Sequence, residues 1–298
     1  MFCIPAIKCL PLAALYGQLL LGLINGSFYV LLSLGLAVIF GMLRVINFAH
    51  GALYMSGAFA SWWLSARLGL SYWAALALAP LIVGALTIVI EKTMLRHMYG
   101  LDPLYGMLLT FGLTLIIEGA FSYHFGSSGQ PYPAPPALRG AVNLGFVTLP
   151  LYRLWVVAAS IVACLGTWLM IERTKLGAYL RAATENPTLV QVFGVNVPRM
   201  MTLTYAFGAA LAAFAGVLAA PIYQVNAAMG SQLIIIVFAV VVAGGMGSLL
   251  GAIVTGYALG LMEGLTKVFY PEGANIVVFV VMAVVLLLRP AGLFGRAT

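Results

Sequence analysis

Long apolar stretches recur along the whole 298-residue sequence and decide what it can fold into. A helix needs about 20 mostly apolar residues to cross the hydrocarbon core of a bilayer. Stretches that reach or approach this length occupy 12–40, 51–66, 72–90, 104–124, 151–171, 202–222, 232–246, 249–269 and 275–288. Charged residues make up only 7% of the chain, against about 25% in soluble proteins, so most of its surface must face lipid. We predict an all-α polytopic membrane protein with eight or nine transmembrane helices in one domain, 1–298.

The fourteen Lys and Arg residues lie singly at the ends of the apolar stretches. This scatter excludes a basic nucleic-acid-binding patch and makes the charges topology signals. With nine spans and the 173–201 connection inside, the inner set comprises Arg44, Lys92, Arg96, Arg173, Lys175, Arg181, Arg199, Arg289 and Arg296. The outer set is smaller: Lys8, Arg67, Arg139, Arg153 and Lys267. Because Lys and Arg concentrate on the cytoplasmic side, we predict an outside N-terminus and a cytoplasmic C-terminus.

Two long polar connections separate the spans. Residues 125–150 are rich in Gly and Pro and predict an ordered external loop or a short hairpin, with no helix before the next span. Residues 173–201 have helix-forming composition before Pro187 and a second apolar run that closes at Gly194. This pattern predicts two short helices, separated at the proline, at the cytoplasmic face.

Glycines interrupt two apolar stretches, 41–57 and 244–256. In transporters built from two related halves, such broken segments point to the substrate pathway. The two stretches are not alike in sequence, so an internal repeat is only weakly indicated. Each stretch is either a loop or a break within the membrane, and the choice changes the span count by one.

Small residues recur at a spacing of four, which places them on one face of a helix. In lipid, such faces allow close approach of helix backbones. We predict helix packing through these glycines, with a gating role as the secondary interpretation: Gly22, Gly26, Gly247, Gly251, Gly256, Gly260 and Gly264.

A few polar side chains lie within or beside the apolar stretches. Asn25 needs a hydrogen-bond partner in hydrocarbon, and an interhelical bond is weighed slightly above solute contact. Asn47 and His50 fit helix capping and solute contact equally well. Ionisable residues in spans are functional candidates by default. Glu263 has Lys267 four residues on as an ion-pair partner, which favours a structural role, whereas Glu118 has no such local partner and is the better functional candidate.

Motifs for chemistry are absent from the sequence. No GxxxxGK[ST] phosphate loop, HExxH zinc motif or GxSxG nucleophile elbow occurs. We therefore expect no enzyme, no metal site and no cofactor bound by this chain. A transporter without an ATP-binding motif needs energy from partner subunits or from an ion gradient.

Four blocks, in order along the chain, resemble the membrane permeases of branched-chain amino-acid ABC importers, and within them the first Liv-type permease subunit. The first block runs from Asn25-Gly26-Ser27 through Gly35 and Gly41 to Ile46-Asn47-Phe48-Ala49-His50-Gly51. The second is Gly177 through Arg181-Ala182-Ala183 to Gly194-Val195-Asn196. The third is Ala243-Gly244-Gly245-Met246-Gly247-Ser248 with Gly251, and the fourth is Arg289 to Gly295. Two departures are Ala52, where many relatives carry an acid, and Val190 with Val192, where small residues are common.

The resemblance implies a permease subunit for branched-chain or related hydrophobic amino acids in the bacterial cytoplasmic (inner) membrane. Its implied partners are a second related permease, two cytoplasmic ATPases that use ATP, and a periplasmic solute-binding protein. The solute pathway is then predicted at Asn25, Ser27, Asn47, His50, Gly51, Tyr54 and Glu118. ATPase coupling is predicted at Arg181, Ala182, Ala183, Glu185, Asn186, Pro187 and Gly194. The alternatives are a permease for urea, short amides or another small solute, a self-sufficient secondary transporter and, for 173–201, an amphipathic segment at lipid headgroups.

Overall fold

The structure is a computed structural model that describes residues 2–4, 7–10, 12–43, 45–143, 145 and 147–295, with backbone alone for 2–4 and 7–10. Of the charges used to predict orientation, Arg44, Arg296 and the Lys8 side chain lie outside this part. A helix occupies each of the nine predicted apolar ranges: α1 (Leu12–Leu43), α2 (Ala49–Leu68), α3 (Tyr72–Thr93), α4 (Pro103–Phe125), α5 (Leu151–Arg173), α8 (Val197–Tyr223), α9 (Met229–Gly244), α10 (Leu249–Phe269) and α11 (Ala274–Leu288). The all-α polytopic fold is confirmed. Two short 3-10 helices, η1 (Leu95–Met98) and η3 (Pro271–Gly273), follow α3 and α10. A hairpin of β1 (Phe2–Ile4) and β2 (Ile7–Leu10) precedes α1.

Seven helices in the described part of the chain are long and apolar enough to cross a membrane. The other two are α2, which lies outside this set, and α9, which is apolar but has only 16 residues. The number of helices that span the membrane therefore stays a prediction of eight or nine.

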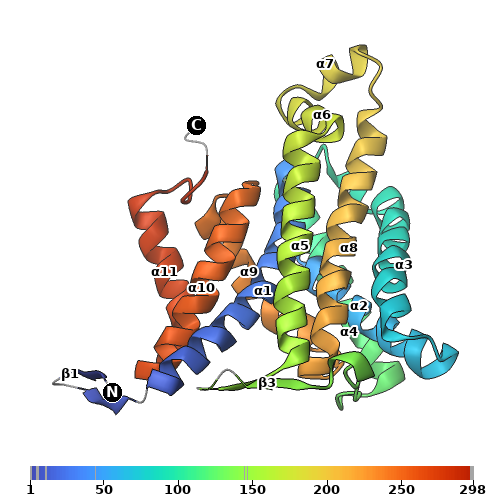
Figure 1. Ribbon diagram of the computed structural model, residues 1–298. Helices are drawn as coiled ribbons and strands as arrows, with labels where there is room; N and C mark the ends of the chain where they lie inside the picture. Colours follow the sequence, from blue (N-terminus) through green and yellow to red (C-terminus); the bar gives the residue numbers. More distant parts are fainter. Residues whose placement is uncertain are drawn as a thin grey trace.

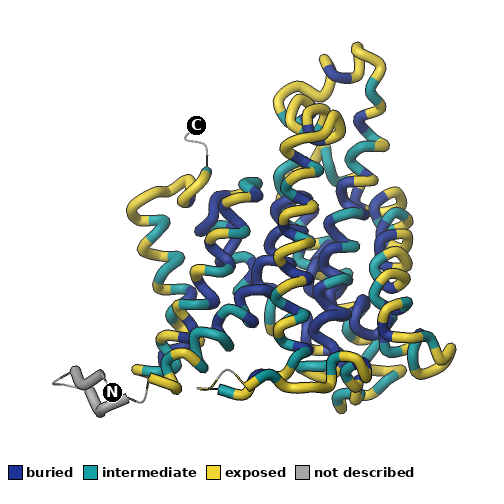
Figure 2. The backbone as a smooth tube through the Cα atoms, viewed as in Figure 1, coloured by how far each residue is buried: buried dark blue, intermediate teal, exposed yellow. Residues whose placement is uncertain are grey.

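Helices α1, α2 and α8 form the centre of the bundle, as the dark core in Figure 2 shows. Small residues bring these backbones together. A Cβ atom added at Gly208 of α8 would lie 2.7 Å from the Gly35 carbonyl oxygen of α1, and one added at Gly35 would lie 2.7 Å from the Gly208 oxygen. Helices α4 and α11 are mostly exposed and supply apolar surface for lipid.

The connection between α5 and α8 forms two short helices, α6 (Lys175–Glu185) and α7 (Pro187–Val192), as predicted. Asn186 separates them and caps α7, because its side chain accepts a hydrogen bond from the Leu189 backbone N–H at 3.0 Å. Helix α8 begins five residues earlier than expected, because the Asn196 side chain caps it by accepting from the Arg199 N–H at 3.1 Å.

The 125–150 connection forms the short antiparallel hairpin β3 (Ala141–Asn143) and β4 (Thr148–Pro150). A 3-10 turn, η2 (Pro136–Leu138), precedes it, which corrects the expectation of no helical segment there. Two backbone hydrogen bonds between Gln130 and Val225, of 2.7 and 3.0 Å, fasten the connection below the end of α8. In Figure 1 this hairpin and the start of α1 lie at one end of the bundle, and α6 and α7 lie at the other.

Candidate functional site

The chain before α2 includes a non-helical segment, residues 45–48, that contacts α4 and α9. The Thr110 hydroxyl of α4 accepts a hydrogen bond from the Phe48 N–H at 3.1 Å and lies 3.3 Å from the Ile46 carbonyl oxygen. The Phe48 ring packs on Phe238 of α9 with centroids 4.8 Å apart. Contacts with α4 and α9 therefore hold this non-helical segment and satisfy part of its backbone.

The second glycine-broken stretch, between α9 and α10, lies against the end of α1. A Cβ atom at Gly247 would lie 3.1 Å from the Gly41 Cα atom. Gly247 has φ of 83°, a conformation that favours glycine, and precedes α10. It therefore does not share a helix face with Gly251, which packs on the Gly244 carbonyl, and the predicted helical spacing is wrong at this position.

The C-terminal block closes the same corner. The backbone N–H groups of Leu293 and Phe294 donate to the carbonyl oxygens of Ala243 and Gly244, at 2.9 and 3.0 Å. The third and fourth sequence blocks thus meet at the end of α9, beside the end of α1.

Three predicted pathway residues lie at the start of α2: Asn47 precedes the helix, and His50 and Tyr54 lie four residues apart within it. Asn47 donates to the Tyr205 hydroxyl at 3.1 Å, and the His50 Nε2–H donates to the Leu32 carbonyl at 3.0 Å. The Asn47 Oδ1, His50 Nδ1 and Tyr54 hydroxyl atoms are buried without a hydrogen-bond partner in the described part of the chain. Unpaired buried polar atoms are costly, so this row is a candidate place for a polar solute.

Two further pathway residues face the start of α9. A Cβ atom at Gly51 would lie 2.7 Å from the Gly230 carbonyl oxygen, so α2 and α9 touch backbone to backbone. Glu118 of α4 lies beside Ser231, the next residue of α9, and its Oε1 atom is buried and unpaired among the described residues. The structure therefore places Gly51 and Glu118 around one helix start.

Asn25 and Ser27 lie in other surroundings. The Asn25 amide lies 3.4 Å from a Glu263 carboxylate oxygen of α10, and its oxygen accepts from the Tyr223 hydroxyl of α8 at 2.9 Å. Ser27 is fully buried, and its backbone carbonyl accepts a 3.3 Å hydrogen bond from Ser160 of α5. The seven predicted residues thus do not form one cluster.

Sequence reasoning missed several buried polar partners. Glu91 of α3 accepts hydrogen bonds from Thr202, at 2.7 Å, and from Tyr99, at 3.0 Å. Tyr29 of α1 donates to Glu263 at 2.6 Å. The sequence offered one signal for such a partner: Tyr29 lies inside a predicted span, and a buried tyrosine hydroxyl needs a hydrogen-bond partner.

The predicted packing glycines of α1 and α10 face one another. A Cβ atom at Gly22 would lie 2.5 Å from the Gly260 carbonyl oxygen, and one at Gly26 would lie 3.3 Å from that of Gly256. Gly264 packs on α1 at the Gln18 carbonyl oxygen and the Gly22 Cα atom. These two helices therefore approach too closely for any side chain between them.

The predicted coupling residues surround α6 and α7. Ala182, Glu185, Asn186, Pro187 and Gly194 are exposed, whereas Ala183 is buried against Val190 and Val197. Met42, near the end of α1, packs on this small core.

Arg181 differs from a free coupling charge. Its guanidinium donates to the Ile171 carbonyl oxygen at the end of α5, at 2.6 Å, and lies 3.4 Å from the Glu172 carboxylate. Gly177 allows this tight turn, because a Cβ atom there would overlap the same Ile171 oxygen. The neighbouring side chains of Val192 and Phe193 are 81% and 77% exposed and form the apolar tip of α7.

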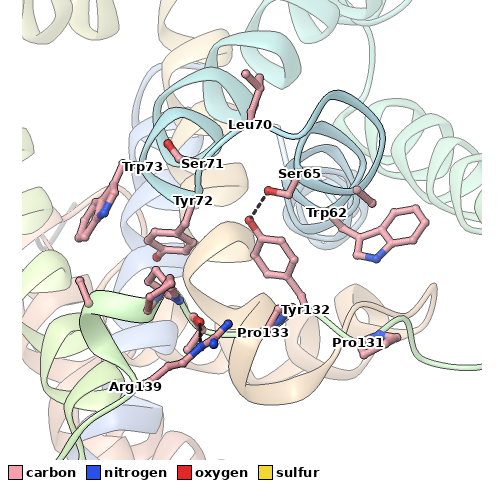
Figure 3. Close-up of a pocket in the computed structure, with 15 residues that line it drawn as sticks. Trp62, Ser65, Leu70, Ser71, Tyr72, Trp73, Pro131, Tyr132, Pro133 and Arg139 are labelled. Carbon is pink, nitrogen blue, oxygen red and sulfur yellow. Dashed lines mark hydrogen bonds between the residues drawn. The ribbon is translucent and has the colours of Figure 1, made fainter.

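A cavity of about 550 Å³ lies at the opposite end, between the α2–α3 turn and the 125–140 chain. Figure 3 shows Tyr132 reaching across it to Ser65, with 3.0 Å between the hydroxyls. Burial raises the pKa of Tyr132, so its hydroxyl stays protonated and can donate this bond. Tryptophans at the rim, Trp62 and Trp73, are typical of a membrane–water interface, and the lining includes none of the predicted pathway residues.

Comparisons with known proteins give one consistent family. The family model described as branched-chain amino acid transport system / permease component matches residues 18–287. The chain is 31% identical over 292 residues to the high-affinity branched-chain amino acid transport system permease protein BraD of Pseudomonas aeruginosa, covering 94% of this chain and 95% of that protein. It is 30% identical over 298 residues to the corresponding protein LivH of Escherichia coli K12, with the same coverage. It is 27% identical over 286 residues to the probable permease LivH of Methanocaldococcus jannaschii, covering 92% and 90%. No solved structure matches.

Proposed function

The chain belongs to the family of branched-chain amino acid transport system permease components, and from this premise we propose that it forms the membrane pathway for branched-chain or related hydrophobic amino acids in an ABC importer. The observation that carries the proposal is the family match over residues 18–287, which includes α2, its buried polar row and the α6–α7 pair. Separate ATPase subunits supply the energy, since the sequence has no phosphate-binding loop.

The solute passes the breaks in the bundle. The row of Asn47, His50 and Tyr54, with Gly51 and Glu118 around the start of α9, offers polar atoms in an otherwise apolar interior. The break between α9 and α10 packs through Gly247 on Gly41, close to the end of α1 and the break that follows it, and segments of the bundle can move at this contact.

The ATPases dock at α6 and α7. The apolar tip at Val192 and Phe193 is exposed beyond the apolar spans, which suits a groove in a soluble partner. The core of Ala183, Val190 and Val197 contacts Met42, close to the break after α1. Movement of the ATPases is thereby transmitted to the pathway.

Replacing Val192 and Phe193 together by Ser tests this docking. We expect normal membrane abundance and loss of co-purification with the ATPases, because the apolar contact area is removed. The matched control is Tyr123→Ser, which changes an exposed aromatic residue at the end of α4, away from α6 and α7. Unchanged ATPase binding by the double variant would refute the docking site.

We place the chain as a multi-pass protein of the bacterial inner membrane, beside a second related permease. With nine of the eight or nine predicted membrane segments, its N-terminus lies outside and its C-terminus inside. The end of the bundle that carries the 125–150 hairpin receives the periplasmic binding protein. Helices α6 and α7, where the ATPases dock, lie at the other end (Figure 1), which supports this assignment.

Deleting the gene and measuring uptake of labelled leucine, isoleucine and valine at low concentration tests the solute class. We expect uptake of at least one to fall, and restoration by the wild-type gene. Unchanged uptake of all three would refute the amino-acid assignment, and uptake of urea and short amides in the same strain would test the alternative solutes.

A further inference from the structure

An ion pair within α10, near the end of that helix, is linked to α1 by hydrogen bonds. Among the described residues, Glu263 is one of two buried acidic side chains, and it pairs with Lys267 one helical turn on. Tyr29 donates to its second carboxylate oxygen at 2.6 Å, and the Asn25 amide lies 3.4 Å from the first. Three residue types that bind charge or donate hydrogen bonds thus converge on one carboxylate.

The cluster extends to the surface through Asn25. The Tyr223 hydroxyl donates to the Asn25 oxygen at 2.9 Å, yet the Tyr223 side chain is 44% exposed. The Lys267 side chain is 35% exposed, against 8% for Glu263. Partly exposed polar groups on apolar helices are more stable against a water-filled path or a partner subunit than against lipid. Ionisable groups in such positions often mark solute pathways.

The other buried acid differs in this respect. Glu91 receives hydrogen bonds from Thr202 and Tyr99 and makes no ion pair with a Lys or Arg in the described chain. The Glu263 cluster, in contrast, places a buried negative group beside a partly exposed positive group. A solute that carries an ammonium and a carboxylate group on one carbon atom would present one charged group to each of these side chains.

We propose that Glu263 and Lys267, with Asn25 and Tyr223, form a contact site for the zwitterionic head of the amino acid in passage. This inference rests on the proposed function. The Glu263 carboxylate receives the ammonium group, and the Lys267 ammonium, which has three N–H donors, receives the carboxylate. The Asn25 amide and the Tyr223 hydroxyl supply neutral hydrogen bonds, and the two ends of the solute replace the mutual pairing of Glu263 and Lys267.

The first test is Glu263→Gln in a strain that depends on this permease for leucine uptake. The amide keeps the side-chain shape and an acceptor for Tyr29 but removes the negative charge. We expect the maximal rate of labelled leucine uptake to fall about tenfold or more, with unchanged membrane abundance and unchanged co-purification of the ATPases. Lys267→Met is expected to give a similar loss, because the carboxylate contact disappears.

The control is Glu272→Gln, the same chemical change at an exposed position just beyond α10, which is expected to leave uptake unchanged. Wild-type uptake by Glu263→Gln at normal abundance would overturn the inference. If Glu263→Gln does not accumulate, Tyr223→Phe, which removes one hydroxyl and keeps the ring, is tested by the same criterion: wild-type uptake at normal abundance would overturn the inference. A wild-type strain that takes up none of leucine, isoleucine and valine would instead refute the proposed function.

The charge swap Glu263→Lys with Lys267→Glu separates solute contact from structural pairing. An ion pair with a purely structural role is restored by the swap, and leucine uptake would recover. A site oriented for a zwitterion presents its charges in the wrong order after the swap, so we expect uptake to stay low at normal abundance. Recovery of uptake to the wild-type rate would overturn the inference.

Discussion

Replacing Gly260 by Ala should separate α1 and α10, which pack backbone to backbone through their glycines. A Cβ atom there would lie 2.5 Å from both the Gly22 carbonyl oxygen and the Gly26 Cα atom. Ordinary contacts begin at 3.4 Å, so α1 and α10 must move apart by about 0.9 Å. Both contacts are backbone atoms that cannot rotate away.

The energetic effect has two opposing parts. Overpacking costs about 1–3 kcal/mol, and the upper end applies because the clash is with backbone. Alanine recovers about 1 kcal/mol of helix propensity over glycine. The net destabilisation is therefore about 2 kcal/mol, which corresponds to a fall in Tm of roughly 4–8 °C.

The assay is the thermal stability of the detergent-solubilised protein, followed by the loss of its monodisperse chromatographic peak. The matched control is Gly166→Ala in α5, where a Cβ atom meets nothing within 4 Å. We expect this control to keep or raise the wild-type Tm, since it gains propensity without a clash. Equal Tm values for the two variants would refute the packing argument.

Three further substitutions test other parts of the structure. Thr110→Val should destabilise the protein by about 1–3 kcal/mol, measured by the same thermal assay, because the partly buried Phe48 N–H loses its acceptor; an unchanged Tm would contradict the role of this hydrogen bond. Gly177→Ala should displace α6 and weaken ATPase co-purification at normal membrane abundance, because its Cβ atom overlaps the Ile171 oxygen; full ATPase binding would show that the turn is not required. Arg181→Glu should lower both abundance and uptake, because the bond to the α5 terminus is lost; loss of uptake at full abundance would instead indicate a direct coupling charge.

The helices were predictable from sequence because each is a long apolar run bounded by local signals. Pro187 and Asn186 mark the boundary of α6 and α7 directly in the sequence. The start of α8 was misplaced because the apolar pattern begins after Asn196, the residue whose side chain caps the helix.

The contacts within the site were harder to predict, because they join residues far apart in the chain. Tyr29 and Glu263 are separated by 234 positions, and no periodicity relates them. Gly247 follows the four-residue spacing of the packing glycines, but its positive φ is set by the turn that brings it to Gly41. Residue type alone indicated that such groups need partners and left the partners undetermined.

The central claim is that this chain is one membrane subunit of an ATP-driven amino-acid importer. The most direct measurement is labelled leucine uptake by proteoliposomes that contain the chain with its co-purified permease and ATPases, with binding protein and leucine outside and ATP enclosed. The account predicts uptake that requires both ATP and the binding protein, and no uptake by the chain alone under an ion gradient. Gradient-driven leucine uptake by the chain alone would contradict it.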